Sequence, residues 1–349
     1  MLEKVLIANR GEIAVRVIRT CRQLGIASVA IYSEPDRDAL HVRLADSAYP
    51  CGGAAPRDSY LRTERVLEIA QRSGADAIHP GYGFLAESAD FSDRCADIGI
   101  VFIGPSGDVI RTMGEKATAR DRIKAAGVPV VPGSDGPIED AQAESCARRI
   151  GFPVMVKASA GGGGKGLRRV EAAAELVGAL ERVRGESRSA FGDDALYLER
   201  YVEAARHIEV QFIADSHGTV IGLGERECSI QRRHQKLIEE TPANAIGSVL
   251  REAMGVATLA AAKAVGYQGA GTCEFLLGPD DEFFFLEMNT RIQVEHAITE
   301  AVTGIDIVAE MIRVAAGEPL GIGEVQPEGH AIETRIYAED PDRGFAPSP

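Results

Sequence analysis

Short apolar runs alternate with helical patterns over the first third of the chain. Residues 12–24 show the three-to-four-residue apolar spacing of an amphipathic helix. The apolar runs have the length of buried strands and lie at residues 5–8, 28–32, 75–78 and 101–103. Strands and helices that alternate in this way are typical of a parallel, doubly wound sheet. We therefore predict an α/β domain over residues 1–115.

Such a domain could bind a dinucleotide, but its first turn argues against this. The turn at residues 8–12 reads Ala-Asn-Arg-Gly-Glu and lacks the G-x-G-x-x-G pattern that brings a backbone close to a pyrophosphate. A second glycine-containing turn, at residues 79–83, follows a predicted strand. Ligands bind at this end of a parallel sheet, although the segment could also be only a turn.

The pattern changes after residue 115. Residues 116–203 are predicted to form a linker and a small unit with strands at 154–157 and 167–170, a glycine-rich loop and an Ala/Glu-rich helix. Residues 204–349 have longer strands and a helix at about 248–265, which is typical of an antiparallel α+β domain. We therefore predict three units with mixed α/β and α+β architecture.

The glycine loop Ser159–Gly166 has two interpretations. Four successive glycines allow backbone N–H groups to wrap around phosphate oxygens, but the loop could also be a flexible hairpin tip. It is not a P-loop, because Lys165 is followed by glycine rather than by Ser or Thr. Lys157, at the end of the preceding strand, favours nucleotide binding under a mobile lid.

A carboxylate and an amide end the apolar run at residues 283–286. Side-chain alternation is expected to place Phe285, Glu287 and Asn289 on one side of a strand. The turn at residues 278–281 is expected to form a hairpin that brings Glu274 near Glu287. These oxygens suit Mg²⁺ or Mn²⁺ bound together with phosphates. The alternative is a pair of exposed carboxylates at a sheet edge.

Charged residues flank this metal candidate. Arg291 and Glu295 follow within one short segment and offer an anion contact and a base. The run at residues 231–236 is rich in hydrogen-bond donors and follows a strand predicted at 219–225. It could cradle an anion or be a solvated basic loop.

Composition limits the possible functions. The 349 residues are 45% hydrophobic and 26% charged, which is ordinary for a globular protein. The formal net charge of −14 disfavours nucleic acid as the main partner. The six cysteines lack zinc or disulfide spacing, and we find no signal peptide or membrane-spanning run, so we expect a cytoplasmic protein without membrane association.

Five motifs stand in order along the chain: IANRGEIA (7–14), HPGYGFL (79–85), KASAGGGGKG (157–166), ERECSIQRRHQK (225–236) and EMNTRIQVEH (287–296). Together they resemble the biotin carboxylase family, the ATP-grasp component of acetyl-, propionyl- and other acyl-CoA carboxylases and of pyruvate carboxylase. The resemblance implies an ATP-grasp fold. It also implies carboxylation of carrier-bound biotin with ATP and bicarbonate, through carboxyphosphate.

The resemblance assigns residues to each substrate. ATP contacts are implied for Lys116, Lys157, Gly161, Gly162, Gly163, Gly164, Glu199, Arg200, Tyr201, Val202, His207, Gln231 and His234. Metal ligands (Mg²⁺ or Mn²⁺) are implied at Glu274, Glu287 and Asn289. The bicarbonate site is implied to contain Lys236, Arg291, Gln293, Val294 and, as general base, Glu295. Tyr82 and Arg335 are implied on the biotin side.

The resemblance also implies partners: a biotin carboxyl carrier protein or domain, a carboxyltransferase and a second copy of the complete protein. The sequence departs from the family at Asn244, Ala297 and Thr334, none of which is a catalytic group. The family usually continues beyond Pro349, so we expect a fragment of a longer chain. Alternatives are another ATP-grasp ligase, such as a carbamoyl-phosphate or purine-pathway enzyme, and a non-catalytic nucleotide-binding module.

Overall fold

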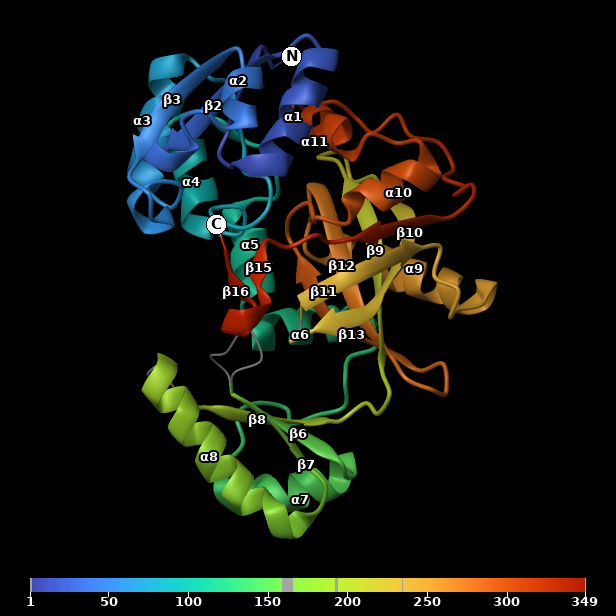
Figure 1. The fold of residues 1–349 in the computed structure, drawn as a ribbon. Coiled ribbons are helices and arrows are strands. Elements are labelled where there is room, and N and C mark those ends of the chain that lie inside the picture. Colours follow the sequence, from blue (N-terminus) through green and yellow to red (C-terminus); the bar gives the residue numbers. More distant parts are fainter. Residues whose placement is uncertain (1, 159–165, 192–193, 234, 349) are drawn as a thin grey trace.

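The computed structural model describes residues 2–158, 166–191, 194–233 and 235–348 (Figure 1). Gly161, Gly162, Gly163, Gly164 and His234, which were predicted to contact ATP, lie outside these ranges. In the described part, three larger sheets organise the chain, and a short pair of strands lies near the C-terminal end.

The N-terminal sheet has five parallel strands in the order β3-β2-β1-β4-β5. Its strands are β1 (Lys4–Ile7), β2 (Ala27–Ser33), β3 (Ser47–Gly52), β4 (Ala77–His79) and β5 (Val101–Phe102). Its helical segments are α1 (Gly11–Gln23), η1 (Glu34–Asp36), α2 (Leu40–Leu44), η2 (Pro56–Asp58), α3 (Thr63–Ser73) and α4 (Ala89–Asp97). The predicted parallel sheet is confirmed. The strand β3 was not predicted, because its sequence lacks a long apolar run.

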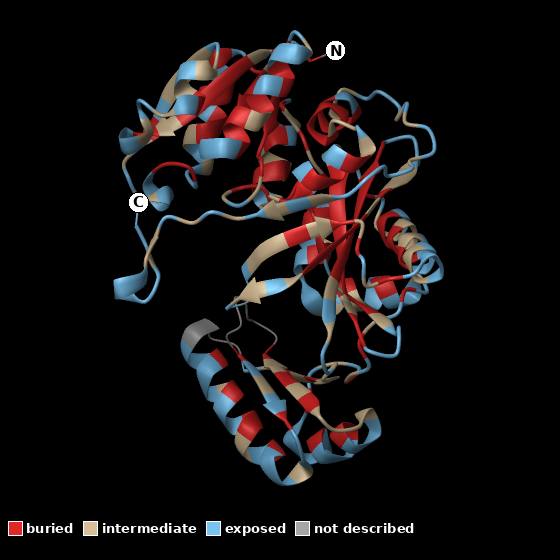
Figure 2. Ribbon diagram, turned by 45° about the vertical axis from the view of Figure 1, so that its right-hand side comes forward, coloured by how far each residue is buried: buried red, intermediate tan, exposed pale blue. Residues whose placement is uncertain are grey.

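A small antiparallel sheet, β7-β6-β8, lies apart from the other two sheets, at the bottom of Figure 1. Two helices lead from the N-terminal sheet: α5 (Gly107–Gly114) and α6 (Lys116–Ala125). The unit itself contains α7 (Asp140–Ile150), β6 (Val154–Ala158), β7 (Leu167–Val170), α8 (Ala173–Phe191) and β8 (Leu196–Arg200). Its buried side chains line the space between sheet and helices, while the outer faces of α7 and α8 are largely exposed (Figure 2).

The third sheet is antiparallel, with the order β13-β12-β9-β10-β11-β14. Its strands are β9 (Arg206–Ala214), β10 (Val220–Arg232), β11 (Gln235–Thr241), β12 (Gly269–Leu277), β13 (Phe283–Asn289) and β14 (Ala331–Thr334). The remaining elements are α9 (Ser248–Ala264), α10 (His296–Thr303), α11 (Ile307–Ala315), β15 (Glu339–Asp340), η3 (Pro341–Arg343) and β16 (Ala346–Pro347).

Alternation along β9 gives this sheet two different faces. Ile208, Val210 and Phe212 belong to the apolar cluster that includes residues of α9. Glu209 and Gln211 therefore point to the opposite face, where they are fully buried. The sheet thus has an apolar face and a polar face, and the polar face carries the candidate chemistry.

Two predictions about this sheet are wrong in detail. The strand predicted to end at residue 225 is β10, which extends to Arg232; Arg232 pairs with Gln235, so the donor-rich run lies mostly on the β10–β11 hairpin. In β13, a register shift between the Glu274–Glu287 and Phe275–Phe285 pairs interrupts the alternation. Phe285 consequently packs in the apolar cluster and does not share a side with Glu287.

An arginine joins the N-terminal sheet to the third sheet. The Arg16 guanidinium donates hydrogen bonds to Glu300 at 2.8 Å and to Asp306 at 2.8 Å. The first carboxylate belongs to α10 and the second caps α11. This contact fixes α1 against the helices that follow the candidate active-site segment.

Candidate active site

The loop after β4 lies at the switch point of the parallel sheet, where the strand order reverses between β1 and β4. The Asn9 amide donates to the carbonyl oxygens of Pro80 at 2.8 Å and Tyr82 at 2.7 Å. Gly81 has a φ of +64°, and a Cβ there would lie 2.9 Å from the Asn9 amide nitrogen. The loop therefore requires glycine, and it directs Tyr82 so that its hydroxyl donates to Glu12.

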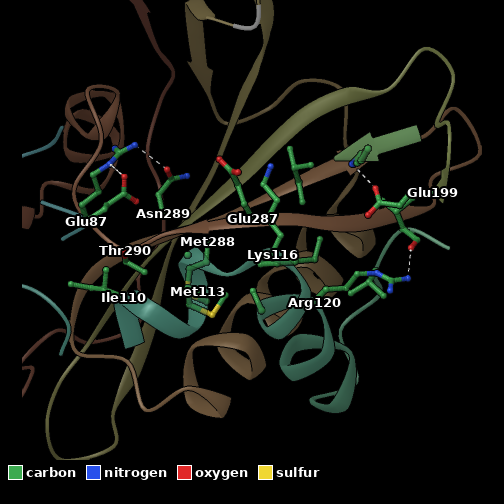
Figure 3. A pocket seen from close by; sticks show the side chains of 18 of the residues that line it. Glu87, Ile110, Met113, Lys116, Arg120, Glu199, Glu287, Met288, Asn289 and Thr290 are labelled. Atoms are coloured by element: carbon green, nitrogen blue, oxygen red, sulfur yellow. Dashed lines mark hydrogen bonds and ion pairs between the residues drawn. The ribbon is translucent and has the colours of Figure 1, made fainter. Parts of the chain in front are cut away.

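A cavity of about 490 Å³ lies between α5, α6, the small sheet and β13 (Figure 3). Lys116 begins α6, and Lys157 lies on β6, where it forms an ion pair with Glu199 of β8. Glu287 of β13 lines the same cavity, beside Lys116 (Figure 3). The cavity also includes Asn289 and Arg291, so residues from three of the predicted groups line one space.

The remaining residues of the 199–202 segment have mainly structural contacts. Arg200 forms an ion pair with Glu282 at 2.8 Å. The Tyr201 ring lies under a guanidinium, that of Arg169, at 4.3 Å. Val202 is near Gly278, at the turn of the β12–β13 hairpin. These three residues therefore connect β8 to its surroundings, and of the four residues only Glu199 lines the cavity.

The predicted hairpin places Glu274 directly opposite Glu287. The Asn289 amide donates to Glu274 at 2.7 Å, and His207 Nε2 lies 2.9 Å from the other Glu274 oxygen. Burial opposes ionisation of Glu274, but His207 and Lys236 hold its pKa well below the usual range. Desolvation within the cavity and the nearby Glu274 charge raise the pKa of Glu287, although its side chain is still partly exposed to solvent.

Lys236 is the centre of the polar face. Its ammonium donates to Glu274 at 2.9 Å, to Glu295 at 2.8 Å and to Glu209. Burial alone would lower the pKa of Lys236, but the three carboxylates raise it well above its ordinary value. One lysine therefore connects the carboxylates predicted for metal binding with the carboxylate predicted as base.

The Glu295 carboxylate is held by cations on both sides. One oxygen accepts from Lys236 at 2.8 Å, and the other accepts from Arg335 at 3.0 Å. Glu295 is only 2% exposed. A carboxylate oriented by two donors has its remaining lone pairs in fixed positions, as a proton acceptor in catalysis requires.

Arg291 lies between the cavity and the N-terminal sheet's loops. Its Nε donates to Glu87 at 2.9 Å, and one terminal nitrogen donates to Asn289 Oδ1 at 3.0 Å. The same asparagine contacts Glu274 through its amide nitrogen. Asn289 thus couples the position of Arg291 to the carboxylate pair.

A buried arginine network, without a predicted role from the sequence, supports these groups. The Arg226 guanidinium is fully buried and donates to Glu209 at 2.6 Å and to Gln293 at 2.7 Å. Arg226 and Lys236 hold the pKa of Glu209 down to about 2 despite its burial. The sequence did contain one indication of this buried network: polar residues alternate at positions 207, 209 and 211 along an otherwise apolar strand.

The other predicted residues lie around this network. The Gln293 amide nitrogen donates to Glu274 at 3.0 Å. Gln231 lies 3.2 Å from His207 Nδ1, and the Val294 carbonyl oxygen lies 3.2 Å from a histidine nitrogen, Nδ1 of His296. Apart from Arg200, Tyr201 and Val202, the described members of the predicted set therefore lie in one region, with Tyr82 and Arg335 at its end near the N-terminal sheet.

The donor set suits a divalent cation. Glu274 and Glu287 oppose each other with two negative charges, and Asn289 adds an amide oxygen. Like charges directly opposite one another on paired strands are destabilising, and a cation between them would neutralise them. Oxygen ligands of this kind fit Mg²⁺ or Mn²⁺.

The small lysine-bearing sheet beside a large antiparallel sheet with buried carboxylates defines an ATP-grasp enzyme. Two family descriptions match the chain: "Biotin carboxylase, N-terminal domain" over residues 1–110, and "Carbamoyl-phosphate synthase L chain, ATP binding domain" over residues 115–322. Relatives over the whole chain are more specific. The chain belongs to the biotin carboxylase family, whose members are ATP-dependent ligases.

Two curated relatives illustrate this similarity. Biotin carboxylase 1 of Bacillus subtilis is 54% identical over 100% of this chain and 78% of the relative. The biotin carboxylase of a Nostoc species is 53% identical over 99% of this chain and 78% of the relative.

Solved structures with similar folds support the same family assignment. The biotin carboxylase-β-γ-ATP complex from Campylobacter jejuni has a TM-score of 0.94 and 48% identity, over 100% of this chain and 78% of that chain. The biotin carboxylase domain dimer of Hydrogenobacter thermophilus 2-oxoglutarate carboxylase, bound to MgADP, ADP and bicarbonate, has a TM-score of 0.91 and 51% identity, over 99% and 77% of the two chains. Within the described residues, no helix combines the length and apolar character needed to cross a membrane.

Proposed function

We propose that this chain catalyses the ATP- and bicarbonate-dependent carboxylation of biotin carried by a partner. The observation that carries this proposal is the position of Glu295 between Lys236 and Arg335. Lys236 also reaches the Glu274 carboxylate of the predicted metal site, while Arg335 is near enough to Tyr82 for its charge to act on the pKa of that hydroxyl. A base in this position can accept the proton of bicarbonate beside the predicted metal site, and it also contacts Arg335 on the biotin side.

The first step is formation of carboxyphosphate. Arg291 and Lys236 hold bicarbonate, and Glu295 accepts its proton as a bicarbonate oxygen attacks the γ-phosphorus of ATP. The bond from that phosphorus to the bridging oxygen breaks, and ADP leaves. Lys116 and Lys157 neutralise the triphosphate. When bound at Glu274, Glu287 and Asn289, Mg²⁺ or Mn²⁺ would supply further charge neutralisation there.

The second step transfers the carboxyl group. Carboxyphosphate breaks down to CO₂ and phosphate, and the phosphate accepts a proton from the biotin ureido nitrogen. That nitrogen attacks CO₂. Arg335 stabilises the enolate-like ureido anion through its guanidinium, and Tyr82 lies on the same side.

The remaining assignments complete the proposal. The ATP site contains Glu199, Arg200, Tyr201, Val202, His207, Gln231, His234 and the loop glycines 161–164, and Gln293 and Val294 contact bicarbonate. The units are residues 1–115, 116–203 and 204–349. The partners are a biotin carboxyl carrier protein or domain, a carboxyltransferase and a second copy of the complete protein, and the protein functions in the cytoplasm.

The test is ATP hydrolysis measured with bicarbonate, with and without free biotin. Biotin-stimulated hydrolysis supports the proposal, whereas hydrolysis that biotin does not affect points to another ATP-grasp ligase. In Glu295→Gln, we expect ATP binding to persist and biotin-dependent cleavage to fall by about 10²–10⁴-fold, the contribution of a general base. Glu252→Gln is the matched control, because Glu252 is exposed on α9. Near-normal turnover in Glu295→Gln would exclude Glu295 as the base.

A further inference from the structure

Two glutamates face each other on the last two strands of the third sheet. Glu239 of β11 is paired in register with Glu333 of β14. Residues directly opposite on paired strands point to the same face of a sheet. Arg335 lies two residues beyond Glu333, and its backbone N–H continues the pairing by donating to Leu237 at 3.0 Å. The arginine therefore shares the face of both carboxyl groups.

The Arg335 guanidinium is shared unequally among the carboxylates. Its Nε donates to Glu239 at 2.6 Å, and one terminal nitrogen donates to Glu295 at 3.0 Å. Glu239 is fully buried. Its second oxygen, Oε2, is buried without a hydrogen-bond partner among the described residues. An unpartnered buried carboxylate oxygen is costly and indicates that a donor belongs beside it.

The charges around Glu333 disfavour its ionisation. Burial, Glu239 and Glu295 raise the pKa of Glu333 to about 7, against the opposing influence of Arg335 and Arg226. Burial and Glu295 also raise the pKa of Glu239, although Arg335 opposes this.

The N-terminal sheet contributes Tyr82, whose hydroxyl is bound to Glu12 and whose pKa is itself raised by burial, Glu12 and Glu333. The helix α10 packs against β14 and carries two titratable groups: His296, whose pKa is lowered by burial, and Glu300, which is paired with Arg16. Arg335 and Arg226 therefore remain the cations named near Glu333, and they do not offset the negative charge there. Coupled carboxyl groups of this kind retain one proton between them.

We propose that Glu239 and Glu333 form a carboxyl pair that holds one proton, and that Glu239 is a positioning residue for the Arg335 guanidinium. The proton resides on Glu333, and Glu239 remains ionised because it accepts the Arg335 Nε hydrogen bond. The protonated Glu333 offers an O–H donor on the face where Glu239 Oε2 lacks a partner. Neither residue contacts a reacting atom.

This pairing has a consequence for the reaction, which rests on the proposed function. With Glu333 neutral, Arg335 balances two carboxylates and can still attract an anion. When Glu333 loses its proton, a third negative charge lies beside Arg335 and repels the ureido anion that forms from biotin. The kcat/KM for biotin should therefore decline as the pH rises through about 7, following the ionisation of Glu333.

The first test observes the proton directly and needs no activity. Infrared difference spectra of the protein, titrated from acid to alkaline pH, should show the carbonyl band of a neutral carboxyl group disappearing near pH 7. That band should lose intensity in Glu333→Gln, leaving only the contribution of other carboxyl groups with a raised pKa such as Glu287, and should be unchanged in Glu240→Gln. Glu240 is the matched control, since it is the next residue on β11 and its carboxylate lies 3.4 Å from His330. A band in Glu333→Gln as intense as that of the unmodified protein overturns the proposal.

The second test uses the pH profile of biotin-stimulated ATP hydrolysis, with free biotin as the probe. Glu333→Gln should lose the decline near pH 7, because its side chain cannot ionise. Glu239→Gln should raise the KM for biotin about tenfold, the effect of losing one charge-assisted hydrogen bond, with less change in kcat. It should also move the decline to lower pH, because the charge that raises the pKa of Glu333 is gone.

Unchanged profiles in both variants would overturn the positioning role. Failure of the proposed function is distinguishable from failure of this inference. In that case the unmodified protein shows no biotin-stimulated hydrolysis, while the infrared titration still decides whether the pair holds a proton.

Discussion

The most informative single substitution is Arg226→Met, which removes a buried cation while preserving most of the side-chain volume. Arg226 is fully buried. Its guanidinium donates five hydrogen bonds, to Glu209 (2.6 Å), Gln293 (2.7 Å), Gln211 (2.8 Å), Thr299 (2.9 Å) and Thr272 (3.4 Å). These partners come from β9, β12, α10 and the segment between β13 and α10, so one side chain connects the polar face to the segment that carries the proposed base.

The magnitude follows from what the substitution leaves behind. Removing one partner of a buried ion pair costs about 3–5 kcal/mol, because the other charge stays buried without compensation. Glu209 retains its contact with Lys236, so we expect the lower part of this range, about 3 kcal/mol. In Arg226→Met/Glu209→Gln the unpaired charge is gone, and we expect at least about 1 kcal/mol to be recovered.

Amide hydrogen exchange of peptides from β9 and β10 is a suitable assay, because it reports local opening free energies in a chain of several units. The control is Arg72→Met. Arg72 is an exposed residue of α3 whose salt bridge to Glu68 is worth about 1 kcal/mol at most. A loss below about 1 kcal/mol in Arg226→Met, or no recovery in the double variant, would refute the view that this network holds the polar face together.

Two further substitutions test charges outside the network. Asp36 accepts hydrogen bonds from Arg10 and Tyr60, and the Arg10 contact above all holds its pKa well below the usual range. The stabilisation from ionised Asp36 is therefore complete above about pH 4 and is lost as the pH falls towards the depressed pKa of Asp36. In urea unfolding, Asp36→Asn should lower the free energy of unfolding by about 1–3 kcal/mol at pH 7 and by progressively less in acid. Equal losses at pH 7 and in acid would contradict this. Glu87→Gln removes the ion-pair partner of Arg291 and leaves the arginine available for bicarbonate. The KM for bicarbonate in the ATP hydrolysis assay should fall by up to about fivefold, since an exposed ion pair is worth about 1 kcal/mol at most. A raised KM would show that Glu87 orients the arginine rather than competing with bicarbonate for it.

The secondary structure was predictable where local patterns determined it. The helix expected over residues 12–24 is α1, and the helix expected near 248–265 is α9, because both carry apolar residues at helical spacing. The β12–β13 hairpin was also predictable, since a turn with Gly-Pro-Asp-Asp separates two apolar runs. The register of that hairpin could not be predicted from the sequence. The bulge beside Phe285 depends on how β13 packs against β12, which a strict two-residue alternation cannot express.

The contacts that orient the site were hidden from the sequence for a different reason. Arg226 and Glu209 are 17 residues apart, and Arg226 and Gln293 are 67 apart. Only the strand order of the third sheet brings them together. Glu239 and Glu333 are a similar case, because pairing β11 with a strand that follows some ninety residues later was not apparent from local patterns. The alternating polar residues of β9 indicated a buried polar face but not its partners.

The cations of the proposed site share one electrostatic feature that bears on substrate binding. Lys157 is paired with Glu199, Arg291 with Glu87, and Arg335 with Glu239 and Glu295. Lys157 and Arg291 would therefore meet an anionic substrate by exchanging a protein carboxylate for a substrate oxygen, not by giving up water, whereas Arg335 keeps its contact with Glu239. Exchange of this kind yields little net affinity per charge, because the lost ion pair offsets the new one. The discrimination between bicarbonate, phosphate and carboxylate must then come from how rigidly the donors are oriented. The buried Arg226 network and the Glu239–Arg335 contact are the parts of the described chain that supply this rigidity.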